Sequence, residues 1–365
     1  MERNLTTGNI GKTIAYFALP YLLSYFLQTL YGMADLFIIG QFDGVDGIAA
    51  VSNGGQVMHM LTVIIVGLAM GTTVTIGKSV GAGKLDAASA SIGNTVTFFM
   101  GMSVVVMAVL VFLVNPIVTL IGIPAEAVAG TRQYLFVCFL GIPFITAYNV
   151  ISAIFRGLGD SKSPMYFIAI ACVANIVLDY VFIGGLGMGP IGAALGTTLA
   201  QTISVIISLI AIRRKETGIH LTKKELRVKR DVLGQILKIG IPVAVQDGCI
   251  QVAFIVISVI ANHRGLNDAA AVGVVEKLIG MIFIVPSSML ATVSALSAQN
   301  IGAGRHDRAR KLLYYAILIT GSYGIVMTIL SELFSKQTVG IFTTDATVIL
   351  LGSQYISSYI IDCIF

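Results

Sequence analysis

Ten apolar segments, each about long enough to cross a lipid bilayer, follow one another along this chain and constrain its fold more than any other feature. A membrane-spanning helix needs about 20 predominantly apolar residues. We therefore predict an all-α, polytopic membrane protein. The predicted spans are Ile14–Ile39, Ile48–Ile76, Ile92–Val114, Gln133–Phe155, Pro164–Ile183, Ile191–Ile212, Val232–Ala261, Ala269–Ala298, Leu312–Leu330 and Leu350–Phe365.

The composition excludes a soluble multidomain enzyme. Of the 365 residues, 56% are hydrophobic and 11% are charged, whereas soluble domains carry roughly 25% charged residues. Four cysteines lie inside apolar segments without a partner at the spacing of a metal site or redox pair. We therefore expect small core residues at Cys138, Cys172, Cys249 and Cys363, no cofactor and no tightly bound metal.

The positive charge is concentrated in a few connections between spans. Nine of the 23 Lys and Arg residues lie between Arg213 and Lys238. Counted over the amino terminus and the loops after even-numbered spans, the number is 19 of 23. Because Lys and Arg bias a loop to the cytoplasmic side, we expect a cytoplasmic amino terminus in the plasma membrane. The net charge of +5 is then a topology signal, and no nucleic-acid partner is expected.

An internal repeat divides the chain. Val80–Ala88 matches Ile301–Ala309 at a separation of 221 residues, and one residue of slippage places Pro20 on Pro242. The repeating unit has six spans, so both copies enter the membrane from the same side and form a parallel repeat. We predict an amino-terminal lobe at 1–213, a basic cytoplasmic linker at 214–231 and a carboxy-terminal lobe at 232–365.

The same repeat predicts a twelve-span plan with an incomplete second copy. A complete second copy would end near residue 434, and Phe365 aligns with Phe144, in the middle of the fourth span. The expectation is therefore a second lobe of about three and a half helices.

Two aspartates inside spans are the strongest candidates for function. A charge at mid-bilayer is costly and persists where it is paired, hydrated or functional. Asp35 follows Tyr31 by four residues and Gln28 by seven, which gives the first span a polar stripe. Asp179 follows Asn175 by one helical turn. Two carboxylates with nearby amides favour a site for a proton or a hard cation such as sodium, because burial and mutual repulsion both increase a carboxylate's affinity for protons.

Other ionisable residues in the spans are secondary candidates, for coupling or for the substrate path. Asp247 lies near a span entrance, and Glu276 and Lys277 are adjacent within the eighth span. Asp362 follows Tyr359 by three residues on a tyrosine-rich face of the tenth span. Structural pairing or packing is the alternative interpretation for each of them.

Three sequence runs resemble the multidrug and toxic compound extrusion family, the MATE exporters. Asp35–Gly40 resembles the aspartate motif of the family's first span. Arg156–Pro164 resembles the loop between its fourth and fifth spans, and Met188–Ala194 resembles the start of its sixth span. The resemblance extends from about Gly8 to the end of the chain.

The resemblance implies a secondary antiporter that exports organic, often cationic, compounds by alternating access while protons or sodium ions move inward. In the family branch with a cation site in the amino-terminal lobe, it implies a cluster of ligands, with a tyrosine nearby at Tyr134. The implied ligands are Asp35, Asn149, Asn175, Asp179 and Thr197. Another branch carries a glutamate on the seventh span, where this chain has Gln251 instead. We expect small organic substrates, surrounding membrane lipid and a monomer.

Two other functions remain as alternatives. A flippase for lipid-linked precursors shares the repeat, but it would line its cavity with several cations, and Lys277 is the one cation that the sequence places inside a span. An intramembrane enzyme would need a His, Cys or paired-acid centre. His59 is the one histidine in a predicted span and has no partner in sequence reach.

Overall fold

A computed structural model describes residues 5–214, 225–343 and 345–364, and these residues form helices and turns without any strand. The prediction of an all-α fold is confirmed. The helices are α1 Ile10–Phe42, α2 Gly44–Gly81, α3 Leu85–Ile121, α4 Ala125–Leu140, α5 Ile142–Leu158, α6 Lys162–Asp179, the π-helix η1 Tyr180–Gly185, α7 Gly189–Arg214, α8 Arg230–Arg264, α9 Leu266–Ile282, α10 Ile284–Gly302, α11 His306–Gly340, α12 Ala346–Ile360 and the 3₁₀-helix η2 Ile361–Ile364.

The described helices account for all ten predicted spans. By length and composition, nine of them, counting α6 with η1, α9 with α10 and α12 with η2, are able to cross a membrane, and α4 with α5 makes a tenth crossing bent by 51°. The bend falls at Gly141, and Phe283 separates α9 from α10. Residues 215–224 of the predicted linker, with Lys215, Lys223 and Lys224, lie outside the described residues.

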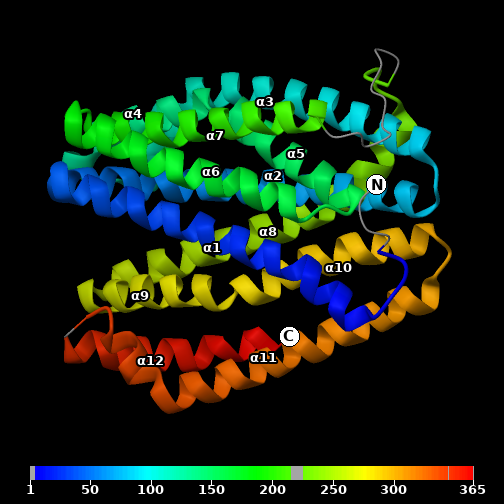
Figure 1. Cartoon of the computed structure of the whole chain (residues 1–365). Coiled ribbons are helices and arrows are strands. Elements are labelled where there is room, and N and C mark those ends of the chain that lie inside the picture. Colours follow the sequence, from blue (N-terminus) through cyan, green and yellow to red (C-terminus); the bar gives the residue numbers. More distant parts are fainter. Residues whose placement is uncertain (1–4, 215–224, 344, 365) are drawn as a thin grey trace.

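The two halves of the chain form two groups of helices that meet along α1, α2, α8 and α10. In Figure 1 the helices up to α7, coloured blue to green, lie above those from α9 to α12, coloured yellow to red, and α1 runs obliquely along the boundary. α2 contacts α8 and α10, and α1 contacts α10. Apolar side chains fill this boundary, where Ile14 and Phe17 of α1 join a core cluster with Ala295 and Leu296 of α10.

The sequence repeat is also a structural one at the contact between α2 and α10. A methyl group on Gly81 would collide with the carbonyl oxygen of Gln299, and one on Gly302 would collide with the carbonyl oxygen of Lys78. Each glycine and each carbonyl lies 221 residues from its counterpart. The two copies thus contact each other reciprocally, and the absence of a side chain at both glycines allows the backbones this close.

Cys249 differs from the sequence prediction. It is exposed on α8, whereas Cys138, Cys172 and Cys363 are buried, and all four are free thiols. The outer surface of a membrane helix faces lipid, so an apolar neighbourhood in the sequence does not distinguish a core position from a lipid-facing one.

Candidate functional site

Asp35 and Asp179 meet in the interior of the first half. Asp35 lies on α1 with 5% of its surface exposed, and Asp179, the last residue of α6, is fully buried. The hydroxyl of Thr197 on α7 donates a hydrogen bond of 3.3 Å to Oδ2 of Asp35. Side chains of Asp179 and Asn175 also lie close enough to Asp35 to interact with it. Four of the five residues implied as cation ligands are therefore together.

Many polar atoms of this cluster have no partner. The buried atoms without a hydrogen bond include Oδ1 of Asp35, both carboxylate oxygens of Asp179 and both amide atoms of Asn175. Although Asp35 and its neighbours are close, their geometry leaves these groups unpaired. An unsatisfied buried polar group costs about 1–3 kcal/mol, and more when it is charged. The cluster is therefore incomplete without a proton or cation.

The local helix structure brings Asp179 to this position. α6 changes to the π-helix η1 at Tyr180, directly after the aspartate, and such irregular turns recur at functional sites. On the facing helix α7, a methyl group on Gly196 would collide with Oδ1 of Asp179. The glycine lets α7 approach the carboxylate and place Thr197 beside Asp35.

A small pocket adjoins the carboxylates, with about 160 Å³ of empty space counting its open side. It is lined by Tyr31, Ala171, Asn175, Thr197, Ala200 and Gln201. Gln201 was not a predicted site residue, yet it is buried and its Oε1 has no hydrogen bond. It follows Thr197 by one turn of α7, so the i to i+4 spacing from Thr197 was the sequence signal that could have identified it.

Oxygen atoms dominate the candidate site. Carboxylate, hydroxyl and amide oxygens suit hard cations, and two neighbouring buried carboxylates favour a bound proton or cation between them. Within the described parts of the chain, there is no group of three or more His, Cys, Asp or Glu residues able to hold a metal ion.

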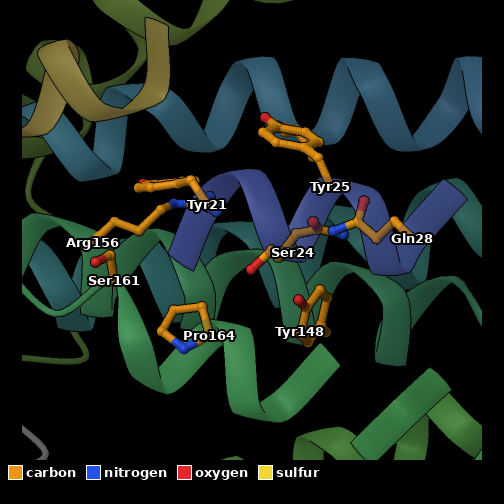
Figure 2. A pocket seen from close by; sticks show the side chains of 10 residues that line it. Tyr21, Ser24, Tyr25, Gln28, Tyr148, Arg156, Ser161 and Pro164 are labelled. Atoms are coloured by element: carbon orange, nitrogen blue, oxygen red, sulfur yellow. The ribbon is translucent and has the colours of Figure 1, made fainter. Parts of the chain in front are cut away.

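Asn149 and Gln28 line a different pocket. This second pocket lies between α1, α5 and α6 (Figure 2) and includes Tyr21, Tyr148 and Arg156. The amide nitrogen of Asn149 donates a hydrogen bond of 2.8 Å to the carbonyl oxygen of Ile145. The structure therefore places Asn149 apart from the four clustered ligands.

Tyr134 lies in the interior of the first half. It is buried on α4, where its ring packs against Gly54 of α2. Cys138, one turn later on the same helix, lies beside its hydroxyl. Its electrostatic interaction with Asp35 shows that the two residues lie near each other.

The secondary candidates of the second half are dispersed. Asp247 on α8 is half-buried and lies against Gly67 of α2, and Gln251, one turn later, is also half-buried. Asp362 is exposed in η2.

Glu276 has defined neighbours within the second half. It accepts a hydrogen bond of 2.9 Å from the hydroxyl of Ser258 and lies near Tyr355 and Tyr359. The adjacent Lys277 is exposed. Glu276 is therefore held by a hydrogen bond between α8 and α9.

Arg156 is the residue that sequence analysis placed incorrectly. It was assigned to a loop, but the structure shows it half-buried on the last turn of α5, lining the second pocket. Lys277 is therefore not the one cation in the interior half of a span. Arg156 follows Asn149 by seven residues, two helical turns, so both face the same side of α5.

A bundle of apolar spanning helices with a buried, oxygen-lined carboxylate pair defines an integral membrane protein built for transport. The family model MatE matches residues 20–181 and 242–365. The chain belongs to this family, the MATE transporters.

Several curated relatives cover almost the whole chain. The probable multidrug resistance protein YoeA of Bacillus subtilis is 27% identical over 353 residues, 95% of this chain and 76% of its own length. The multidrug export protein MepA of Staphylococcus aureus is 24% identical over 94% of this chain and 76% of its own length. A protein named FAD transporter from Shewanella oneidensis is 23% identical, with coverages of 97% and 79%.

Solved structures share the fold. A multidrug resistance MATE family transporter in an outward-facing conformation has a TM-score of 0.89 at 22% identity, over 99% of this chain and 80% of the other. A MATE structure in a bent conformation has a TM-score of 0.87 at 22% identity, with coverages of 98% and 78%.

Proposed function

We propose that this protein is a secondary multidrug antiporter, which exports organic compounds while protons or sodium ions bind at Asp35 and Asp179 and move inward. The observation that carries the proposal is the pair of buried carboxylates with unpaired oxygens, beside the unpaired amide of Asn175. Relatives named for multidrug resistance and multidrug export support the transported class. Because another relative is named FAD transporter, the substrate range has to be argued from this chain's own pockets.

The coupling follows from the electrostatics of the pair. With both carboxylates ionised, the pair repels itself in surroundings that solvate charge poorly. A bound proton or sodium ion removes that repulsion and supplies the partner that the free oxygens lack. The occupied and empty sites then favour different positions of α1, α6 and α7, which is the differential binding that a conformational change requires.

The contacts between the halves support alternating access. The side-chain amide of Gln299 on α10 donates a hydrogen bond of 2.9 Å to the carbonyl oxygen of Gly157 on α5. Together with the glycine contacts of α2 and α10, this bond closes the end of the molecule that carries the basic connections. We place this closed end, and the amino terminus, at the cytoplasmic side of the plasma membrane, with the two lobes acting within one monomer.

The driving force is sufficient for export. One charge moving down a membrane potential of 100 mV contributes about 2.3 kcal/mol, which corresponds to roughly fifty-fold accumulation of a neutral substrate per charge.

Efflux measurements on Asp35→Asn in membrane vesicles test the proposal. The amide cannot carry the charge that the cation neutralises, so we expect cation-driven efflux of a fluorescent organic cation to fall to background at unchanged protein level. Asp46→Asn is the matched control, because Asp46 is exposed in the first turn of α2, and it should retain wild-type efflux. Wild-type rates in Asp35→Asn would contradict the proposed coupling site.

A further inference from the structure

Arg156 is an unpaired cation in the second pocket. The part of the chain that the structure describes offers its guanidinium no hydrogen-bond acceptor and no salt bridge, although the residue is half-buried. Its nearest described partner is the ring of Tyr21, whose centroid lies 5.5 Å from the guanidinium carbon. A guanidinium has five N–H donors in a planar fork that matches a carboxylate or phosphate. The pocket therefore presents an anion-binding group without an anion.

Two buried hydroxyls line the same pocket and also lack partners. Tyr21 and Ser161 are each 4% exposed, and neither the phenol oxygen of Tyr21 nor Oγ of Ser161 makes a hydrogen bond. Figure 2 shows both residues beside Arg156 at one end of the pocket. Leaving such hydroxyls unpaired costs about 1–3 kcal/mol each. Because both are able to donate to an oxyanion, the same ligand would satisfy all three groups.

The rest of the pocket is suited to a ring. Tyr25, Tyr148 and Pro164 line it, with Gln28 at the end away from Arg156. Aromatic side chains provide large, rigid contact surfaces for another ring. The pocket contains about 450 Å³ of empty space counting its open side, so its enclosed part suits the head group and first ring of a substrate.

We propose that Tyr21, Arg156 and Ser161 form a subsite for the oxyanion group, a carboxylate or phosphate, of an aromatic organic substrate. The inference rests on the proposed export function and defines a substrate class for it. The subsite is separate from the coupling pair. Tyr21 and Asp35 are fourteen residues apart on α1, about 21 Å along a helix. The protein would therefore accept aromatic anions and zwitterions as well as cations.

Equilibrium binding to matched probes tests the subsite. The full chain is placed in phosphatidylcholine nanodiscs, and binding of 2-naphthoate, 2-naphthyl phosphate and the neutral 2-naphthamide is measured by calorimetry without an ion gradient. We expect both anions to bind at least about tenfold more tightly than the amide, since hydrogen bonds to a charged group contribute about 1.5–3 kcal/mol. Arg156→Gln should remove this preference without changing amide binding, and Arg156→Lys should restore part of it.

Lys162→Gln is the matched control. It removes one positive charge six residues further along the chain, at an exposed side chain that stacks on Tyr16 outside the pocket. Its anion preference should equal that of the wild type. Asp35→Asn should also bind the anions normally, which separates a failure of this subsite from a failure of the coupling site.

Three results would overturn the inference. They are equal affinities for naphthoate and naphthamide in the wild type, an unchanged preference in Arg156→Gln, or loss of naphthoate binding when phosphatidylglycerol replaces phosphatidylcholine. The last result would assign the subsite to lipid phosphate. If Arg156→Gln does not yield a monodisperse protein, Ser161→Ala and Tyr21→Phe serve instead. Each should weaken anion binding about threefold to tenfold and leave amide binding unchanged.

Discussion

At the residue scale, the candidate site depends on polar side chains whose roles are visible in the sequence to different degrees. Asp35 and Asp179 could be predicted because a carboxylate inside an apolar segment is costly and therefore informative. Gln201 and Arg156 could not be predicted in the same way. Gln201 is uncharged, and Arg156 lies at the end of a predicted span, where a cation is ordinary. Their burial depends on packing between helices distant in sequence.

Gly196→Ala tests whether close packing holds Asp179 in place. The added methyl group would meet Oδ1 of Asp179, and overpacking of this kind costs about 1–3 kcal/mol. We expect a lower apparent unfolding temperature in detergent, measured by thiol-reactive dye fluorescence, and weaker cation binding. Gly101→Ala is the control, because nothing lies within 4 Å of a methyl group there and alanine is the better helix former. Equal unfolding temperatures for the two variants would contradict this packing argument.

At the element scale, the hydrophobic pattern predicted each span but not the breaks inside spans. The bend at Gly141, the separation at Phe283 and the π-helix η1 all lie within continuous apolar segments. Apolar composition is the same on both sides of each break, so hydropathy carries no signal of it. The breaks depend on local backbone geometry and on the neighbouring helices. The position of Asp179 next to η1 was therefore outside the reach of the sequence.

The reciprocal glycine contacts predict a symmetric response to mutation. Gly81→Ala and Gly302→Ala each place a methyl group against a backbone carbonyl of the other repeat, which cannot move as a flexible side chain can. We expect both variants to destabilise the closed end and shift the population toward an arrangement open at that end.

Spin labels measure this shift by double electron–electron resonance. Asp86 and Asp307 are suitable label sites, because both are exposed in the first turns of α3 and α11 and lie 221 residues apart. Labelling requires Cys249→Ser, since Cys249 is the exposed one of the four cysteines. Longer distances are expected in both glycine variants, and Gly321→Ala, which has open space around it, should match the parent. An unchanged distance distribution in both would show that these glycines do not control closure.

At the scale of the whole molecule, the repeat of 221 residues was the most informative feature. It predicted two copies of one plan, and the reciprocal contacts of Gly81 and Gly302 agree with it. The lobe boundaries at 213 and 232 remain predictions, since part of the linker lies outside the described residues. The sequence did not predict how closely the halves approach each other along α2 and α8, where a methyl group on Gly71 would collide with the carbonyl oxygen of Ile236.

The central claim is that a coupling cation binds between Asp35 and Asp179. Solid-supported-membrane electrophysiology on reconstituted protein measures it most directly, because a concentration jump reports charge moving into the site even before a transport cycle. We predict a transient inward current after a proton jump or a sodium jump in the wild type, and none in Asp35→Asn or Asp179→Asn. A current of wild-type size in either variant would contradict the account.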